Sequence, residues 1–424
     1  MTDTSATSAR ILRTYVTLTL LSTFASSFIW GINTLFLLDA GLTVTGAFAA
    51  NAFFTAGQVL FEVPTGVMAD TVGRRASYLL GSATLFASTL FYLLLWRIEG
   101  PFWAWALVSM LLGLGFSFFS GATEAWLVDA LHSTGYEDTL DSAFAKGQIA
   151  GGVAMLTGTV AGGVIAQATN LGVPYALRAI MLALTLAVAF VAMRDVGFTP
   201  RRGASFLLEM RRILEASLEH GFRNPPVRWL MLGAPFSAGV GMYAFYAMQP
   251  YLLELYGRKD AYSTAGLAAA IVAGTQIIGG YLVRYVGKVC LRRTTFLLFG
   301  AILSGAALVT IGLVSSFGVV MALFAVWAVV FAAVTPVQQA FVNGLIPSEQ
   351  RATVLSSANL MASSGGVVFQ PALGRVADAS GYPASYLACA AIELLALPFV
   401  WLARRERAPS DRIAKGTRAD RCMD

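Results

Sequence analysis

Charged residues are scarce in this chain. Asp, Glu, Lys and Arg together make up 12% of its 424 residues, whereas soluble proteins carry about 25%. So few polar side chains cannot cover a soluble protein of this length, which excludes a soluble enzyme and a disordered chain. The two histidines and three cysteines show no ligand or pairing pattern, so we expect no metal site, no disulfide framework and no cofactor.

Long apolar runs fill most of the sequence. Hydrophobic residues make up 57% of it, and a helix needs about 20 such residues to cross a bilayer. Twelve runs have this length, which predicts an all-α membrane protein with twelve transmembrane helices. The expected spans are 15–38, 46–69, 76–96, 101–130, 143–168, 173–193, 229–256, 262–286, 294–315, 318–345, 352–377 and 383–403.

The basic residues predict the orientation of these spans, because Lys and Arg resist translocation. With the N-terminus inside, the inner segments hold 24 of the 29 basic residues. The outer segments hold the other five, which are Arg97, Arg178, Arg258, Lys259 and Arg375. We therefore expect a multi-pass protein of the plasma (inner) membrane with both termini in the cytoplasm. The same asymmetry explains the net charge of +6 without a nucleic-acid partner.

The two halves of the sequence resemble each other, which indicates an internal duplication. Residues 66–74 align with 280–288, residues 124–131 with 338–345 and, at a shift of 211, residues 163–167 with 374–378. We expect two pseudo-symmetric six-helix bundles, 15–193 and 229–403, between an N-terminal cytoplasmic segment 1–14 and a basic tail 404–424. Parallel repeats of this kind place a solute site between the bundles near the membrane midplane.

The segment between the bundles, 194–228, has a pattern of its own. Apolar residues recur there at helical spacing among arginines and glutamates. This pattern predicts an amphipathic helix that lies on the cytoplasmic membrane surface. A coupling helix that packs beneath the bundles without touching lipid fits the pattern equally well.

The loop after the second span reads Gly66-Val-Met-Ala-Asp70-Thr71-Val-Gly73-Arg74-Arg75. It resembles the signature of the major facilitator superfamily, G-x-x-x-D-[RK]-x-G-R-[RK], with Thr71 in place of a base. The resemblance covers essentially the whole chain and implies a secondary transporter that is not an enzyme. It also implies a cytoplasmic latch in which Asp70 faces the start of span eleven near Ala352 and Arg74 pairs with Asp129. Such a latch favours the outward-open state, whereas the plainer alternative is a loop that only sets insertion topology.

The fifth span contains Gly158-Thr159-Val-Ala-Gly162-Gly163. This resembles the family's antiporter motif, which ends G-P-x-x-G-G, although Thr159 replaces the proline. Pro371 and Gly374 form the counterpart in span eleven. Small residues at this spacing let helices approach closely in lipid, so close packing explains the motif at least as well as exchange does.

Ionisable residues inside spans are costly and usually serve a cavity or a partner. Glu62 lies eight residues before Asp70, about 12 Å into the membrane at 1.5 Å per residue. Glu124 in span four and Lys146 in span five complete a set of three candidates for proton coupling. The alternative is a permanent Glu–Lys pair that only fixes helix packing. Glu393, near the middle of span twelve, is expected to serve packing.

Polar and aromatic residues follow one face of several spans and are the candidates for a solute cavity. They are Trp30, Asn33, Asn51, Gln58, Tyr243, Tyr246, Gln249, Gln276 and Gln338. Aromatic and amide groups suit small amphipathic organic solutes, although the tyrosines of span seven are equally compatible with an interfacial belt.

These features predict a monomeric, proton-driven antiporter that exports drugs or metabolites. Its expected partners are a small-molecule substrate, protons and the lipid bilayer, and the proton gradient is its energy source, since the sequence has no phosphate-binding loop of an ATP-driven pump. Uptake of a nutrient or metabolite by proton symport is the main alternative. A membrane sensor without transport activity is a minor one.

Overall fold

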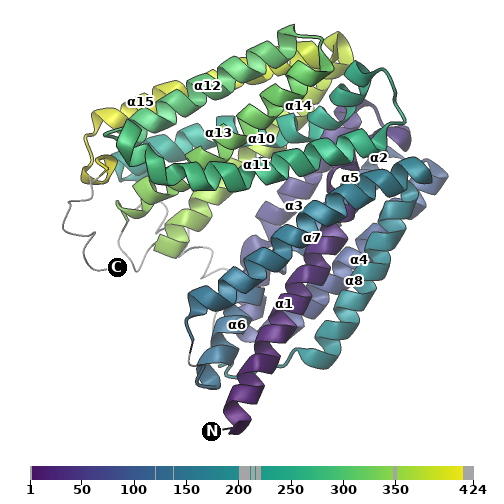
Figure 1. Ribbon diagram of the computed structural model, residues 1–424, viewed down its shortest axis with the longest axis vertical. Coiled ribbons are helices and arrows are strands. Elements are labelled where there is room, and N and C mark those ends of the chain that lie inside the picture. The colour runs from purple at the N-terminus through teal and green to yellow at the C-terminus, as the bar shows by residue number, and fades with distance from the viewer. Residues whose placement is uncertain are drawn as a thin grey trace. The chain divides into compact units, whose positions relative to one another are not determined.

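The computed structural model describes residues 2–119, 121–136, 138–199, 211, 215, 221–346 and 351–413. All of its named elements in these ranges are helices (Figure 1). They are α1 (Thr2–Trp30), α2 (Asn33–Asp39), α3 (Val44–Thr71), α4 (Arg74–Ile98), α5 (Phe102–Ser117), α6 (Ala122–Ser133), α7 (Leu140–Ala168), α8 (Gly172–Ala192), α10 (Pro225–Tyr256), α11 (Tyr262–Val289), α12 (Arg293–Leu313), α13 (Phe317–Asn343), α14 (Arg351–Leu394), α15 (Leu397–Arg405) and the short 3₁₀ helix η2 (Pro409–Asp411). The amphipathic linker helix predicted within 194–228 lies mostly outside the described residues.

The helices supply twelve membrane spans. Ten helices in the described ranges are long and apolar enough to cross a bilayer, and the bent pair α1–α2 brings the number to 11. The last of these runs over 52 residues, about 78 Å, which is too long for a single crossing of about 30 Å. Its backbone breaks at Gly381, where φ is 83°, so it supplies two spans. The prediction of a twelve-helix membrane protein is confirmed.

Two predicted spans are broken rather than continuous. The span expected over 15–38 bends by 51° between α1 and α2. The span expected over 101–130 divides into α5 and α6, and Gly121 before α6 adopts a left-handed φ of 69°. By contrast, Pro64 and Pro336 lie inside the continuous helices α3 and α13. The breaks therefore do not occur where proline alone would place them.

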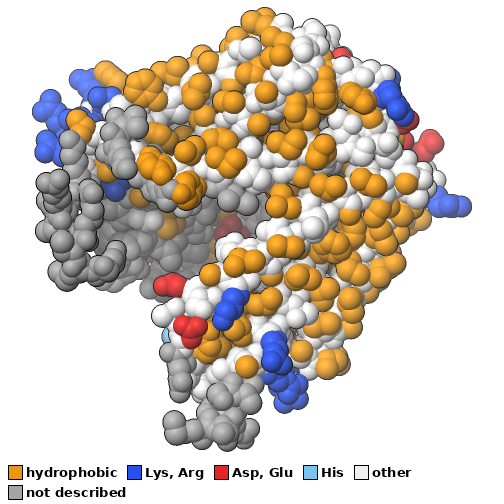
Figure 2. All heavy atoms as spheres, in the orientation of Figure 1, with side chains coloured by type: hydrophobic (Ala, Val, Ile, Leu, Met, Phe, Trp, Pro, Cys, Tyr) orange, Lys and Arg blue, Asp and Glu red, His pale blue; other side chains and the backbone are white. Residues whose placement is uncertain are grey.

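The outer flanks of the helices are apolar, as a bilayer requires. Large exposed side chains include Leu60, Trp103, Phe190, Phe299 and Leu313. Figure 2 shows hydrophobic side chains spread along the sides of the helices, whereas Lys and Arg gather near helix ends and loops. A soluble protein would not expose so much contiguous apolar surface.

The chain divides into two compact units. Unit 1 comprises 1–211 and 245–270, and unit 2 comprises 212–244 and 271–424. These bounds differ from the two expected bundles in one respect, because Phe245–Ala270, the end of α10 and the start of α11, packs in unit 1. The reason is a close approach in which a Cβ on Gly163 of α7 would lie 2.7 Å from the carbonyl oxygen of Tyr262 and 3.0 Å from Cα of Gly266.

Glycines bring the helices of unit 1 into backbone contact. A Cβ on Gly162 of α7 would clash with the carbonyl oxygen of Phe28 on α1, and one on Gly158 would clash with the Ser27 hydroxyl. Ser27 Oγ in turn donates to the carbonyl oxygen of Ala154 at 3.0 Å. The structure thus places two glycines of the predicted packing motif at the α1–α7 contact.

Unit 2 repeats this contact with other residues. A Cβ on Gly365 of α14 would clash with the carbonyl oxygen of Pro235 on α10, and one on Gly239 would lie 2.5 Å from the Gly365 carbonyl oxygen. Pro371 and Gly374, the residues singled out in the sequence, lie further along α14, where Gly374 is buried and Pro371 partly buried. The motif therefore indicates the correct helix but not the glycine at the contact.

The duplication extends to individual hydrogen bonds. Tyr175 of α8 donates its hydroxyl to Asn33 Oδ1 at 2.9 Å, and Tyr386 of α14 donates to the carbonyl oxygen of Ala244 at 3.0 Å. The two tyrosines are 211 residues apart, which is one of the shifts found in the sequence. Equivalent positions in the two units can therefore be compared directly at this shift.

The glycine contact at α1–α7 predicts how substitutions on α7 affect stability. We expect Gly162→Ala to lower the free energy of unfolding by about 1–3 kcal/mol, because the added methyl group forces the two backbones apart. The matched control is Gly152→Ala on the same helix, where a Cβ meets no described atom within 4 Å and alanine improves helix propensity. Thermal unfolding in detergent measures both variants. Equal midpoints for the two variants would contradict the proposed contact.

Candidate functional site

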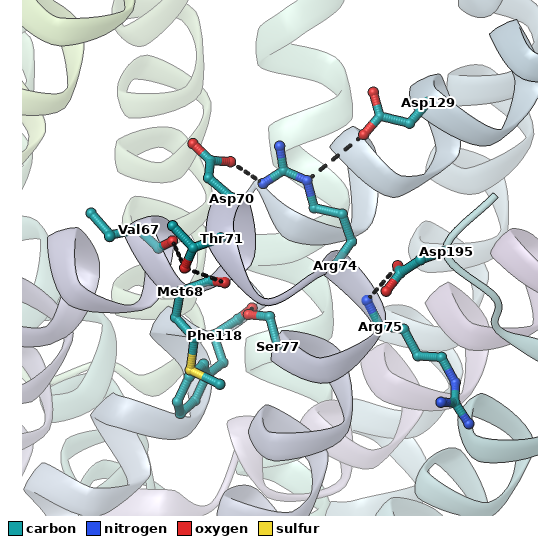
Figure 3. A network of polar contacts seen from close by, with 10 residues as sticks. All are labelled: Val67, Met68, Asp70, Thr71, Arg74, Arg75, Ser77, Phe118, Asp129 and Asp195. Atoms are coloured by element: carbon teal, nitrogen blue, oxygen red, sulfur yellow. Dashed lines mark hydrogen bonds and ion pairs between the residues drawn. The ribbon is translucent and has the colours of Figure 1, made fainter. Parts of the chain in front are cut away.

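The signature loop joins α3 to α4 and holds a small ionic network (Figure 3). Arg74 Nη1 lies 2.5 Å from Asp70 Oδ1 and Arg74 Nε lies 3.8 Å from Asp129 Oδ2 on α6. The structure thus brings together the arginine and the aspartate of the expected pair. These side chains are 20–37% exposed, and exposed ion pairs contribute about 0–1 kcal/mol each. Such a network is weak enough to open and close.

The second glycine of the loop has a conformational reason to be there. Gly73 has a φ of 133°, which side-chain-bearing residues rarely adopt. A Cβ at this position would also lie 2.5 Å from Asp195 Oδ2. The close approach lets Asp195 Oδ1 accept the backbone N–H of Arg75 at 2.9 Å, which satisfies a free donor at the start of α4. The Arg75 guanidinium donates to the carbonyl oxygen of Phe190 at 2.8 Å and lies over its ring.

Asp195 was not identified from the sequence, and unit 2 contains its counterpart. Asp411 of η2 accepts the backbone N–H of Thr294 at 2.8 Å and the Thr294 hydroxyl at 2.9 Å, at the start of α12. In each unit, an aspartate that follows the last span caps the third span. The shift between Asp195 and Asp411 is close to the repeat of the spans, so an alignment that ran past the apolar segments would have paired them.

The other described residues of the signature loop do not take part in the ionic network with Asp129. Thr71, which replaces the usual base, donates its hydroxyl to the Val67 carbonyl oxygen at 2.9 Å within its own helix. A Cβ on Gly66 would meet no described atom within 4 Å. The expected contact of Asp70 with the start of span eleven stays a prediction, because the side chain of Ala352 lies outside the described ones.

The three candidates for proton coupling do not form a cluster. Glu62 is half-buried on α3, whereas Glu124 and Lys146 are exposed. Within the described ranges, no ion pair joins Lys146 to either glutamate. The loop residue Asp138 interacts with Lys146 instead. The pKa of Asp138 is lowered from its ordinary value, first by the Thr139 backbone N–H that donates to its Oδ1 at 2.8 Å, then by the Ser142 hydroxyl, and to a lesser degree by Lys146. The described residues therefore show no contact that would support a permanent pair of Lys146 with Glu62 or Glu124.

Four of the residues proposed to line a cavity form hydrogen bonds at the bend of the first span, namely Trp30, Asn33, Asn51 and Gln249. In a continuous helix, the N–H of Thr34 would bond to the carbonyl oxygen of Trp30. Here the Gln249 side chain of α10 is inserted between them, accepting from the Thr34 N–H at 3.0 Å and donating to the Trp30 carbonyl oxygen at 2.9 Å. Asn33 donates to Asn51 Oδ1 at 3.0 Å. These buried amides act as backbone and side-chain partners within unit 1.

The two remaining candidates of unit 1 lie around this bend and along α3. Tyr246 is half-buried, with its ring 5.4 Å from that of Phe245, which in turn lies 4.9 Å from the Trp30 ring. Gln58 is half-buried on α3. Neither lines the cavities described in unit 2, and their contact with a solute stays a prediction.

Arg178 is a functional candidate that sequence reasoning missed. The count assigns it to an outer segment because it lies near the start of span six, which is the outer end of that span on the expected topology. The structure instead places it on α8, with the side chain 2% exposed in the core of unit 1. Its Nε donates to Thr89 Oγ1 at 3.1 Å, and its guanidinium lies 5.9 Å from the centre of the Phe116 ring. The basic-residue count treats every arginine as a topology signal, which concealed this one.

The three residues of unit 2 proposed to line a cavity differ in their surroundings. Tyr243 is fully buried and donates its hydroxyl to Ser385 Oγ at 2.8 Å, so it packs in the core rather than facing a cavity. Gln338 lines a cavity of about 320 Å³. The side chain of Gln276 lies outside the described ones.

Unit 2 has a second hollow of about 580 Å³ with an almost wholly apolar lining, but the cavity at Gln338 is the one that contains larger polar side chains. The Gln338 cavity lies towards the end of the unit where α10 and α12 begin and α13 ends. Most of its wall is apolar, and its larger polar side chains are Gln338, Gln339, Asn359 and Glu393. Glu393, expected to serve packing alone, is 6% exposed and accepts a hydrogen bond from Ser237 Oγ at 3.1 Å. It is the one ionisable residue among the described lining of the cavity.

Twelve spans in two related units, a signature loop with an ionic network and a cavity among the helices are typical of a polytopic membrane transporter. The chain matches the family model of the Major Facilitator Superfamily over residues 15–369 and 290–421. These matches cover most of the chain, and the protein belongs to that family. It is a transporter, not an enzyme, and its substrates are small molecules.

Solved structures show the same fold at low sequence identity. A point mutant of the nucleoside transporter NupG has a TM-score of 0.74 at 12% identity, covering 92% of this chain and 99% of that one. A bacterial homologue of the human lysosomal transporter Spinster, inward-facing and unoccupied, has a TM-score of 0.70 at 18% identity, covering 96% and 99%. A D-xylose–proton symporter has a TM-score of 0.69 at 16% identity, covering 92% and 97%. No curated protein matches the chain.

The two glycines of the signature loop should respond differently to substitution. We expect Gly73→Ala to lower the free energy of unfolding by about 1–3 kcal/mol, because the side chain strains a positive φ and displaces Asp195 from the start of α4. Gly66→Ala is the control within the same motif and should leave stability unchanged or slightly raised. Thermal unfolding of the purified variants measures both. Similar losses at the two positions would show that the helix start at Gly73 is not the reason for that glycine.

Proposed function

We propose that this protein is a proton-coupled secondary transporter that exports small amphipathic organic molecules by alternating access. The observation that carries the proposal is the cavity in unit 2. Its volume of about 320 Å³ falls within the usual range of ligand pockets, about 300–1,000 Å³. Its apolar wall suits a hydrophobic body, and its amides and carboxylate suit one or two polar groups.

The packing of unit 1 supports alternating access. On the expected topology the cavity of unit 2 lies near the cytoplasmic end. Towards the opposite end, unit 1 encloses Phe245–Ala270 through the Gln249 bonds and the contact of Gly163 with Gly266. Alternating access requires such contacts to break and re-form, and single hydrogen bonds and exposed ion pairs are weak enough to do so. In the proposed cycle the Gln249 bonds of unit 1 and the Arg74 pairs, which are formed in this structure, break and re-form.

Glu62 is the residue we propose for proton coupling. It lies inside a transmembrane helix, is half-buried, and has no hydrogen bond or ion pair to its carboxylate within the described part of the chain. A carboxylate in such surroundings can bind a proton when one side of the membrane is accessible and release it on the other. Lys146 and Glu124 are exposed, so Glu62 is the only one of the three candidates that is partly desolvated. Glu393 is a second carboxylate in a membrane-spanning helix, placed where it would meet the solute.

Uptake by proton symport is the second candidate. The observation that favours it is the set of Gln338, Gln339 and Asn359 in one cavity wall, because amides hydrogen-bond well to hydroxyl-rich solutes. The direction of movement separates the two. Under an imposed proton gradient, an exporter moves solute against the proton flow, and a symporter moves it along the proton flow.

The coupling assignment predicts a separation of exchange from driven transport. The solute for the assay is a compound that raises the unfolding temperature of the protein in a screen of drugs, sugars and amino acids. In proteoliposomes, Glu62→Gln should lose uphill transport at least tenfold while retaining solute exchange, because the protein can still alternate but no longer carries the proton. Glu254→Gln, at an exposed position on α10, is the matched control.

Glu393→Gln distinguishes solute binding from coupling. If Glu393 meets the solute, this variant should raise the KM of exchange while keeping uphill transport under saturating solute. If it loses uphill transport and Glu62→Gln does not, the coupling residue is Glu393 and our assignment of Glu62 is wrong.

A further inference from the structure

The core of unit 1 contains a positive charge that its surroundings do not balance. Arg178 has five N–H donors, and its Nε donates a hydrogen bond to Thr89 Oγ1. Its Nη2 is buried and has no hydrogen-bond partner. No acidic side chain forms an ion pair with Arg178 within the described ranges. An unpaired charge is strongly unfavourable in a protein core, so we expect a partner that the protein itself does not supply.

The groups that act electrostatically on Arg178 come from three helices, and all are neutral. Tyr92 of α4, Tyr175 of α8 and Tyr246 of α10 are the groups that interact with it electrostatically. Tyr92 shares a hydrogen bond with Ser109 at 2.7 Å, and the Tyr175 hydroxyl is donated to Asn33. The hydroxyls of two of these tyrosines are therefore already engaged, and none supplies negative charge.

A second buried donor of unit 1 also lacks a partner, in a hydrogen-bond chain that includes Tyr175. Asn51 accepts from Asn33, which accepts from Tyr175, but Asn51 Nδ2 has no hydrogen-bond partner although the residue is 4% exposed. Buried polar atoms are almost always satisfied by protein, water or an ion. Two orphaned donors and a cation without an acid indicate that the missing partner is an acceptor with negative charge.

The duplication shows that packing does not require this arginine. At the shift of 211 that relates Tyr175 to Tyr386, the position of Arg178 corresponds to Cys389 in unit 2. Cys389 is fully buried and uncharged. Because the equivalent helix packs in unit 2 with a small neutral residue, the guanidinium in unit 1 serves another purpose.

We propose that Arg178 forms an anion-binding subsite in unit 1, which takes a small monovalent anion. The anion is either the carboxylate of a transported solute or inorganic chloride. Only the first source rests on the proposed transport function. The subsite lies near the segment Phe245–Ala270, which carries Tyr246, so it becomes accessible when this segment leaves unit 1.

The test measures the unfolding temperature of the purified full-length protein in sodium chloride, sodium benzoate and sodium sulfate at matched ionic strength. For the parent we expect a saturable rise of about 2 °C or more in chloride or benzoate relative to sulfate. Arg178→Gln should lose this rise, and Arg178→Lys should keep it at higher anion concentration. Arg97→Gln, which removes an exposed arginine, is the matched control and should behave as the parent. General salt effects act on all variants alike and cancel.

A further variant protects the test against misfolding. Arg178→Met removes the charge but keeps a side chain of similar length. Since replacing a buried charge by an apolar residue removes its desolvation cost, this variant should be at least as stable in sulfate as the parent and should not respond to chloride or benzoate.

The outcomes separate the two sources. If chloride and benzoate compete for one saturable effect and benzoate stabilises more, the subsite takes the carboxylate of a solute. If only chloride acts, it takes an inorganic anion. No anion-specific rise in the parent, or an equal rise in the parent and Arg178→Met, would overturn the proposal. Neither result depends on measuring flux, so a failure of the proposed transport function remains distinguishable.

Discussion

Close approach of helix backbones is the constraint on which the rest of this structure depends. Lipid tails are as apolar as leucine, so helices in a bilayer gain little from hiding apolar surface and associate through close packing instead. Gly162 against Phe28 in unit 1 and Gly365 against Pro235 in unit 2 provide this packing. Once these contacts fix the helix spacing, the side chains of the bend, the latch and the cavity acquire their positions.

A second constraint is that backbone polar groups must find partners without water. The bend of the first span separates the N–H of Thr34 from the Trp30 carbonyl oxygen, and the amide of Gln249 replaces their bond. Asp195 and Asp411 do the same for the starts of α4 and α12. Some of the polar residues that the sequence suggests for a solute cavity therefore serve as hydrogen-bond partners of backbone groups at helix ends and breaks.

The sequence predicts the spans, the family and the pair of Arg74 with Asp129, because hydropathy and a motif of fixed spacing are local signals. It does not predict which polar residues face a cavity, since this depends on the rotation of each helix about its axis. Tyr243 and Gln338 both lie within apolar stretches of the sequence. The structure nevertheless buries Tyr243 against Ser385, whereas Gln338 lines the cavity. The burial of Arg178 was missed for another reason, since the count of basic residues treats every arginine as a topology signal.

Two buried charged residues have neutral counterparts at the equivalent positions of the other unit. At the shift of 211, Arg178 corresponds to Cys389, and Glu393 corresponds to Leu182. All four residues are buried, so each position packs well with a neutral side chain in one of the two units. Desolvation opposes a charge at either place, and neither charge has an ion-pair partner within the described ranges. The neutral counterparts Cys389 and Leu182 therefore support the two proposals made above, that Arg178 meets an anion in unit 1 and that Glu393 meets the solute in unit 2.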